Sequence, residues 1–221
     1  MRHLILLIKI YLPLYKEMKK FLTQLFLGKK QVMENQTLYN LYQDGRHWEK
    51  RPAIYAERYA AFLQERWFTG QIVDLGCGAG RDAAVFHRQG LEVLGIDISA
   101  EEIRKAQLNH PSCKFEVQDV QALAWADNSV AAYFMINVIH YLNQQQALNE
   151  IHRTLRLGGY LFIHFNLDIT DEEGNNDYHH DEKDIARLVS KFKIVERRKF
   201  ERVDSLPKIH THQILELILQ K

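Results

Sequence analysis

The hydrophobic pattern from residue 71 onward alternates between short apolar runs and longer segments that carry one apolar face. The apolar runs predict buried strands at 71–75, 91–97, 113–119, 130–136 and 160–165, with helices between them at 81–89, 99–109 and 144–157. A helix at 181–190 then precedes two strands, near 192–200 and 212–219, that can pair antiparallel. Nearly all-apolar strands alternating with helices are typical of a parallel sheet covered on both faces. We therefore predict an α/β fold with a doubly wound sheet of about seven strands, mostly parallel with an antiparallel last strand and helices on both faces.

Local signals support several of these boundaries. Ser99, with Glu102 three residues later, forms a capping box that opens one helix. Asp181 is a good N-cap for the last helix. The pair Gly158-Gly159 predicts the turn from the helix at 144–157 into the fifth strand. A further helical pattern, from Trp48 to Phe68, precedes the first strand.

The stretch VDLGCGAGRD, residues 73–82, ends the first predicted strand and opens the next helix. Gly76 and Gly78 let the backbone approach a ligand without a Cβ between them, and Gly80 allows tight packing where the helix begins. That helix start also offers unpaired N–H groups. Because ligands of open α/β sheets bind at the carboxyl ends of the strands, the loop predicts a ligand site.

The spacing and charge of this loop restrict the ligand. Its glycines follow G-x-G-x-G, whereas a dinucleotide loop needs G-x-G-x-x-G. Asp74, at the strand end, would repel a pyrophosphate and attract a cation, and Asp82 adds a second carboxylate. The loop therefore favours a ligand that carries positive charge. The alternative that both carboxylates only cap the helix stays open.

D-L-G-C-G-x-G, followed by an acidic residue that ends the second strand (GIDIS, Asp97), resembles the class I S-adenosylmethionine-dependent methyltransferase family. Within it, the chain is similar to small stand-alone members with a type 11-like methyltransferase domain, and the similarity covers about residues 48–221. Asp119 closes FEVQDV, and NVIHY (137–141) and EIHRTLRLGGYLFI (150–163) resemble later family segments in the same order. The fold that this resemblance implies is Rossmann-like.

The resemblance implies S-adenosyl-L-methionine as the cofactor. The matching positions are Asp74, Gly76, Cys77, Gly78, Gly80, Asp97, Ile98, Asp119, Val120 and Asn137. Asp74 and the loop would flank the amino-acid part, and Asp97 would accept both ribose hydroxyls. Ile98 would cover the adenine, Asp119 and the Val120 N–H would contact its edge, and Asn137 would border the methionine end. The alternative for Asp97 and Asp119 is an ordinary turn at a strand end.

The acceptor is less clearly marked, because methyl transfer depends mainly on the orientation of two bound partners. The N/D-P-P-Y/F turn of enzymes that methylate exocyclic amines is absent, and neither Cys77 nor Cys113 is placed as a catalytic nucleophile. Residues 31–221 carry 22 Lys and Arg against 27 Asp and Glu, which argues against a nucleic-acid partner. We expect a small-molecule acceptor, under a lid that residues 167–180 and the N-terminal helix can form.

Histidines near that lid are candidates for a general base, because imidazole titrates near neutral pH. His140 is the first choice by its position after the fourth strand, ahead of His164, His179 and His180. The alternative for each is a solvated or core histidine. No metal site is predicted, because these residues lack a recognised ligand spacing such as H-x-x-x-H on a helix.

Residues 1–32 differ in character from the rest of the chain. Residues 1–30 hold seven Lys and Arg against one Glu, and Leu14 to Phe26 follow an amphipathic helical pattern. We interpret residues 1–32 as a basic apolar extension, either a helix packed on the domain or sequence upstream of a true start at Met18 or Met33. Contact of residues 1–30 with a membrane surface is the less favoured interpretation. Residues 33–221 form the predicted methyltransferase domain.

Two cysteines outside any C-x-x-C pair fit a reducing compartment, so we expect a cytoplasmic protein. The favoured function is methyl transfer from S-adenosylmethionine to a small molecule. Alternatives are a non-catalytic S-adenosylmethionine-binding regulatory module and a methyltransferase of a protein or lipid. A nicotinamide-dependent enzyme is disfavoured by the glycine spacing and by Asp74. The sequence does not specify the oligomeric state.

Overall fold

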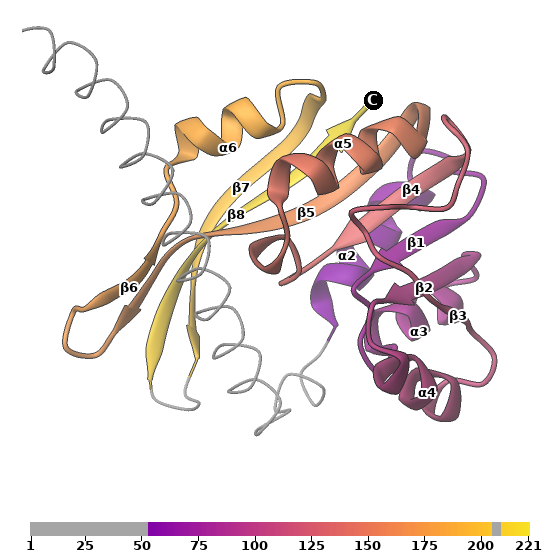
Figure 1. Ribbon diagram of the computed structural model, residues 1–221, viewed down its shortest axis with the longest axis horizontal. Helices are drawn as coiled ribbons and strands as arrows, with labels where there is room; N and C mark the ends of the chain where they lie inside the picture. Colours follow the sequence, from indigo (N-terminus) through magenta and orange to yellow (C-terminus); the bar gives the residue numbers. More distant parts are fainter. Residues whose placement is uncertain (1–52, 205–208) are drawn as a thin grey trace, which may run out of the picture. The chain divides into compact units, whose positions relative to one another are not determined.

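The computed structural model describes residues 53–204 and 209–221, and these residues form an eight-stranded sheet with helices on both faces (Figure 1). The strands are β1 (Ile72–Leu75), β2 (Val93–Asp97), β3 (Lys114–Val117), β4 (Val130–Met135), β5 (Leu155–Asp171), β6 (Asn176–His179), β7 (Lys193–Asp204) and β8 (His210–Gln220). The helices are α2 (Ile54–Gln64), α3 (Arg81–Arg88), α4 (Ala100–Asn109), the 3₁₀-helix η2 (Ile139–Tyr141), α5 (Gln144–Thr154) and α6 (Glu182–Leu188). The predicted extension 1–32 and the helix start at Trp48 lie outside the described residues.

The strand order is β3-β2-β1-β4-β5-β8-β7, with β6 paired to β5. The pairs from β3 to β5 are parallel, whereas β8 runs antiparallel to both β5 and β7. The predicted fold class is confirmed, including the antiparallel pairing of the last two strands. Because the strand order reverses beside β1, the carboxyl ends of β1 and β4 border the crevice where such sheets bind ligands.

Alternate side chains of the strands supply two separate cores. Val73, Tyr133 and Phe165 lie in the core that α5 and α6 cover. Ile72, Phe134 and Phe162 lie in the core that α2, α3 and α4 cover. Burial on both faces explains why the central strands are apolar at most positions rather than at every second one.

Side-chain caps fix two of the helix starts as predicted. The Ser99 side chain accepts a hydrogen bond from the Glu102 backbone N–H at 3.3 Å, and Asp181 accepts one from Lys183 at 2.8 Å. The helix predicted at 144–157 ends earlier, at Thr154, and both glycines of the predicted turn lie inside β5. They lie at an irregularity of that strand, because Leu155 pairs with Val130 whereas Tyr160 pairs with Ala132, and Gly158 has φ +75°.

Residues 167–180, the predicted lid, contain an additional short strand beyond the about seven that were predicted. They form the outer end of β5, a turn and the short strand β6, which gives the eighth strand. The physical reason is that β8 begins as early as His210 and offers a backbone partner to β5 out to Asp171. Asp171 then closes the turn, because its Oδ1 accepts hydrogen bonds from the Glu173 and Asn175 backbones.

None of the helices in the described part of the chain has the length and apolar character needed to cross a membrane.

Candidate functional site

The glycine loop connects the carboxyl end of β1 to α3 and lies against the end of β2. The Cys77 N–H donates to the Ile96 carbonyl of β2 at 2.9 Å, and the Gly80 N–H donates to the Cys77 carbonyl at 3.0 Å. Gly76, Gly78 and Gly80 have φ angles of +68°, +52° and +86°, in the left-handed region that disfavours residues with a Cβ. This backbone path requires the three glycines whatever the loop binds.

The three glycines differ in what surrounds them. A Cβ at Gly80 would lie 2.7 Å from the Phe115 ring of β3, and a Cβ at Gly76 would overlap the Val138 side chain. Packing within the chain therefore explains these two positions. A Cβ at Gly78 would have its nearest neighbour, Glu102 Oε2, at 4.0 Å. Gly78 is the glycine whose backbone faces open space, where a ligand can approach it.

Asp74 lies in β1 directly before the loop and is only 3% exposed. Burial, and then the negative charge of Asp82, raise the pKa of Asp74, while Arg81 and a backbone hydrogen bond from Ala83 oppose the rise. Its Oδ2 is buried and has no hydrogen-bond partner in the described structure. A buried carboxylate oxygen without a partner is costly, so this atom is well suited to a cationic or hydrogen-bond-donating ligand.

Asp97 ends β2, and its carboxylate is held by two backbone donors. Oδ2 accepts a hydrogen bond from the Gly78 N–H at 3.0 Å, and Oδ1 accepts one from the Ser99 N–H at 2.9 Å. Burial raises the pKa of Asp97, and these two hydrogen bonds oppose the rise. Each oxygen retains acceptor capacity. The structure thus places Asp97 next to Gly78, the glycine of the loop that has open space beside it. Their positions at the ends of neighbouring strands predict this contact.

The other predicted cofactor residues lie at the ends of β2, β3 and β4. Ile98 follows Asp97 and is 70% exposed, which is unusual for a large apolar side chain. Asp119 follows β3, where its Oδ1 accepts a hydrogen bond from the Gln121 N–H at 2.8 Å, and the adjacent Val120 is buried. Asn137 follows β4 in a left-handed conformation with φ +57°. An ordinary turn accounts for the hydrogen bond of Asp119 but not for the exposure of Ile98.

His140, in η2, is held from both of its ring nitrogens. Its Nε2 accepts a hydrogen bond from the Asn166 backbone N–H at 3.2 Å, so the ring proton is on Nδ1. Nδ1 lies 2.9 Å from the hydroxyl oxygen of Tyr178, which belongs to β6. Burial, and then His180, His164 and His212, lower the pKa of His140 to about 3. His140 is therefore a neutral imidazole that joins the segment after β4 to the hairpin.

The geometry at Asn166 explains why His140 lies there. β4 pairs with β5 as far as Ile163, and β6 pairs with it from Asp168. The backbone between these two partners would otherwise lack a strand neighbour on that edge, and His140 supplies the acceptor for Asn166.

The remaining predicted histidines do not gather at one point. His164 faces the α2 side, where its Nε2 bonds Glu216 Oε2 at 2.8 Å inside the core. His179 is exposed on β6 and pairs with Asp168 at 2.7 Å. His180 follows β6 and packs its ring near Phe165 and Tyr178. Burial raises the pKa of the Cys77 thiol, which fits its predicted place as a loop residue rather than a nucleophile.

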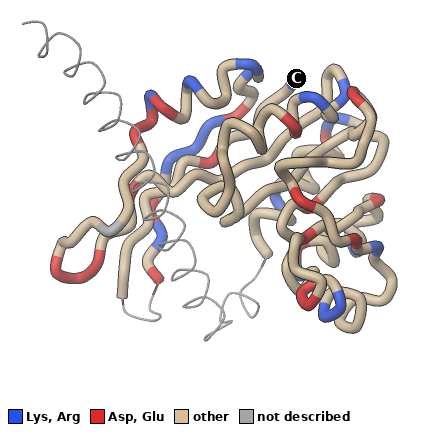
Figure 2. Tube along the Cα trace, in the orientation of Figure 1, with Lys and Arg blue, Asp and Glu red and all other residues tan. Residues whose placement is uncertain are grey.

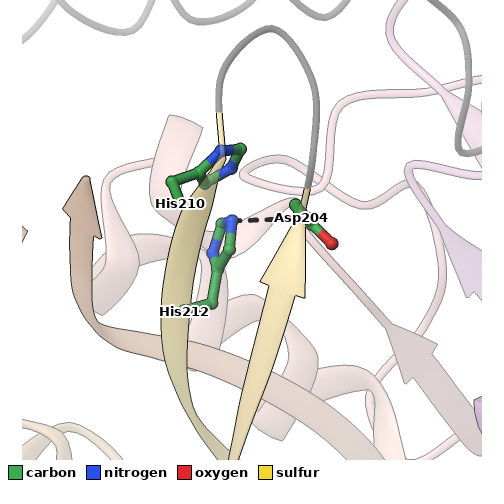
Figure 3. A group of neighbouring side chains, drawn as sticks. All are labelled: Asp204, His210 and His212. Atoms are coloured by element: carbon green, nitrogen blue, oxygen red, sulfur yellow. Dashed lines mark ion pairs between the residues drawn. The ribbon is translucent and has the colours of Figure 1, made fainter. Parts of the chain in front are cut away.

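One group with metal-ligand chemistry was missed in the sequence. Asp204, His210 and His212 lie at the outer end of the β7–β8 hairpin, with their ligand atoms all within 4.8 Å of one another (Figure 3). The available signal was H-T-H, because residues two apart on a strand share a face. The predicted strand began only at His212, so His210 was left outside it.

Comparison with known proteins agrees with this geometry. Residues 73–163 match the family model described as a methyltransferase domain. A malonyl-[acyl-carrier protein] O-methyltransferase of Pseudescherichia vulneris is 30% identical over 40% of this chain and 36% of its own length. A probable S-adenosylmethionine-dependent methyltransferase of Mycolicibacterium smegmatis is 26% identical over 77% of this chain and 66% of its own. The match thus spans little more than a third of the first relative's length.

Solved structures support the fold. A structure from Methanosarcina mazei, described as a S-adenosylmethionine-dependent methyltransferase, aligns with a TM-score of 0.57 at 22% identity and covers 68% of this chain and 92% of its own. The matched family segment runs from within β1 to within β5 and includes Asp97, Asp119 and the segment after β4. Members of this family use S-adenosylmethionine as the methyl donor. Residues 73–163 thus match the methyltransferase-domain family, and the fold is that of class I S-adenosylmethionine-dependent methyltransferases.

Proposed function

We propose that this chain transfers a methyl group from S-adenosylmethionine to a small-molecule acceptor. The observation that carries the proposal is the hydrogen-bonded contact between His140, after β4, and Tyr178, on the β5–β6 hairpin. This contact ties the segment after β4 to the hairpin. We infer that the hairpin covers the acceptor side and limits it to a small molecule.

The residues of the donor site fit S-adenosylmethionine in charge and shape. The donor carries a sulfonium, whose methyl group is electrophilic, and an ammonium. Asp74 offers a buried carboxylate oxygen without a partner, which suits a cation. Gly78 leaves backbone open to a ligand, and Asp97 beside it has two oxygens for a pair of hydroxyls. We assign Asp74 and the 76–80 loop to the amino-acid part and Asp97 to the ribose.

The adenine would lie between the ends of β2 and β3. Ile98 presents an exposed apolar side chain there, and Asp119 and the Val120 N–H offer one acceptor and one donor for the ring edge. Asn137 would border the methionine end, next to Val138, which packs against Gly76 of the loop. These assignments follow the family resemblance position by position.

The acceptor side is built from the segment after β4 and the hairpin. Since the Nδ1 proton of His140 points at the Tyr178 oxygen, the Tyr178 hydroxyl proton is available to donate elsewhere. We assign this hydroxyl to orienting the acceptor. Burial raises the pKa of Tyr178 to about 12, so it acts as a donor rather than as an anion. The general-base role of His140 stays a prediction, since accepting a proton requires that one of its two partners be displaced.

Charge favours an acceptor that is not a polyanion. The tip of the hairpin carries Asp171, Glu172 and Glu173, which appear as a continuous acidic segment in Figure 2. These carboxylates would repel a nucleic-acid backbone at the entrance to the acceptor side.

The donor assignment is tested by calorimetric titration of the full chain with S-adenosylhomocysteine, with NADH as the control ligand. We expect S-adenosylhomocysteine to bind and NADH not to bind. Asp97→Ala should weaken binding by about 10- to 150-fold, which corresponds to the ~1.5–3 kcal/mol of a charged hydrogen bond. The matched control is Asp184→Ala, an exposed carboxylate on α6 whose loss should leave the affinity unchanged. Unchanged affinity in Asp97→Ala would exclude the ribose assignment.

The acceptor assignment is tested by measuring S-adenosylhomocysteine release with pooled small carboxylic acids, phenols and amines, and separately with tRNA and with acyl-carrier protein. We expect turnover with a small-molecule pool and a higher KM for that acceptor in Tyr178→Phe. Turnover confined to a macromolecular substrate would overturn the proposal while leaving the donor assignment intact.

A further inference from the structure

Asp204, His210 and His212 bring three ligand groups to one face of the β7–β8 hairpin. Asp204 and His210 are direct partners in the strand register, and His212 is two residues further along β8. Direct partners share a face of the sheet, as do residues two apart on one strand. The two imidazole rings have centroids 4.8 Å apart, and Figure 3 shows both beside Asp204 at the end of the hairpin.

The spacing of these atoms is close to that of a metal site. Bonds of about 2.0–2.2 Å in tetrahedral geometry place ligand atoms roughly 3.3 Å apart. His212 Nε2 lies 3.5 Å from Asp204 Oδ2, drawn as a dashed line in Figure 3. All three ligand atoms lie within 4.8 Å, so side-chain rotation is sufficient to bring them around one ion.

The surroundings orient His212 as metal ligands are usually oriented. Its Nδ1 lies 3.3 Å from the side-chain oxygen of Asn166, which places the ring proton on Nδ1 and directs the Nε2 lone pair toward Asp204. A second-shell oxygen that accepts the other ring N–H is the usual support of a metal-bound histidine. Arg202 Nη2 lies 3.1 Å from Asp204 Oδ2, so an ion would compete with this guanidinium for that oxygen.

We propose that Asp204, His210 and His212 bind a divalent transition-metal ion of the Zn²⁺ and Co²⁺ type. Two imidazoles with one carboxylate suit these ions, whereas Mg²⁺ and Ca²⁺ prefer all-oxygen sites. Three protein ligands leave at least one coordination position for water or another molecule. Asn166 joins this site to the methyl-acceptor side, because its side chain contacts His212 and its backbone N–H donates to His140. Binding of the ion does not depend on the proposed methyl transfer.

The test uses the full chain without an affinity tag, treated with a chelator and dialysed. Co²⁺ is titrated while visible absorption is recorded, and Zn²⁺ and Mg²⁺ are titrated by calorimetry. We expect one equivalent of Co²⁺ to give ligand-field bands, Zn²⁺ to displace it, and Mg²⁺ to produce no binding signal.

Variants identify the ligands. His210→Ala changes a side chain that is only partly buried, and Asp204→Asn keeps the shape while removing the charge. Each should weaken Zn²⁺ binding by at least about tenfold, the lower limit for loss of a supporting group. His179→Ala is the matched control, because His179 pairs with Asp168 on the adjacent hairpin but lies outside the group.

Absence of one-equivalent binding by the unmodified chain would overturn the proposal. The proposal would also be overturned if His210→Ala and Asp204→Asn bound Zn²⁺ as tightly as the unmodified chain. Circular dichroism must show that all three proteins are folded.

Discussion

At the scale of single residues, the glycines of the loop perform different tasks despite their even spacing. Gly80 makes room for Phe115, whereas a Cβ at Gly78 would meet open space. Both have positive φ, so replacing either residue costs roughly 1–2 kcal/mol of backbone strain. Of these two positions, only Gly80 also has a neighbour, Phe115, that an added Cβ would clash with.

Gly80→Ala should therefore destabilise the fold more than Gly78→Ala. We expect a loss of about 1–2 kcal/mol for Gly78→Ala, and a further ~1–3 kcal/mol for Gly80→Ala from overpacking against Phe115. Urea unfolding of both variants measures the difference, and S-adenosylhomocysteine titration should show weakened binding in Gly78→Ala although it remains folded. Equal stability losses would contradict the assignment of Gly80 to packing.

The protonation of His140 gives a second prediction at this scale. Its folded pKa of about 3 lies below the ordinary histidine value near 6.5, so the neutral ring is favoured in the fold. Its contribution to stability is full above pH ~6.5 and declines as the pH falls toward 3. The NMR signal of the His140 ring should not move between pH 8 and 5.5. His179, whose pKa the Asp168 carboxylate raises, is the control that should titrate. A midpoint near 6.5 for His140 would contradict its placement.

The sequence predicts the positions of site residues best where those residues lie at a strand end. The order of apolar runs places Asp74, Asp97 and Asp119 there, and the structure puts each within two residues of the end of its strand, whereas their roles stay predictions. The Asp204–His210–His212 group was not recovered, because its members meet only through strand pairing across a hairpin. Neither apolar periodicity nor a local motif marks that pairing.

At the scale of elements, β5 is the strand whose length departs most from the sequence-based prediction. Its apolar run, 160–165, predicts six residues, and the observed strand has 17. The polar outer part becomes a strand because β8 and β6 supply hydrogen-bond partners on its two edges. Such tertiary support is absent from the local pattern of residues 166–171, which is why the prediction stopped short.

Glu216 ties α2 to this extended part of the sheet. Its carboxylate, 1% exposed, contacts Arg58 of α2 and accepts a hydrogen bond from His164 of β5 at 2.8 Å. Burial alone would raise the pKa of Glu216, but the hydrogen bonds from His164 and Arg58 outweigh it and lower that pKa. The stabilisation is therefore present at neutral pH and is lost as the pH falls through the lowered pKa.

Glu216→Ala should lower the free energy of unfolding by about 3 kcal/mol, since it leaves a buried network without one partner. Chemical denaturation at pH 7 measures this loss. Glu182→Ala removes a more exposed carboxylate that pairs with Arg197 and Lys199, and it should cost at most about 1 kcal/mol. A Glu216 variant as stable as the Glu182 variant would show that the buried network does not stabilise the fold.

At the scale of the described molecule, our assignments give the two halves of the sheet different tasks. The residues assigned to the donor come from the ends of β1 to β4, and the hairpin on the acceptor side comes from β5 and β6. A ligand that binds the first half should stabilise the whole domain, because β1 and β4 lie at the centre of the same sheet.

S-adenosylhomocysteine at about 100 times its Kd should add ~2.7 kcal/mol to the free energy of unfolding. For a chain of this size that corresponds to a rise in Tm of roughly 5–10 °C, measured by differential scanning calorimetry on the full chain. NADH at the same concentration is the control and should leave Tm unchanged. A rise that persists in Asp97→Ala would place the ligand elsewhere.

The gap between the β4 and β6 partners on one edge of β5, at Asn166, gives the protein an internal reporter of the hairpin. The Asn166 amide is protected by the His140 ring rather than by a strand, and that ring is fixed in turn by Tyr178. When the hairpin opens, Tyr178 moves away and His140 is free to turn. Hydrogen–deuterium exchange at this single amide would then accelerate while the amides of β5 within the core stay protected. The exchange rate of Asn166 therefore measures how often the acceptor side is open to solvent.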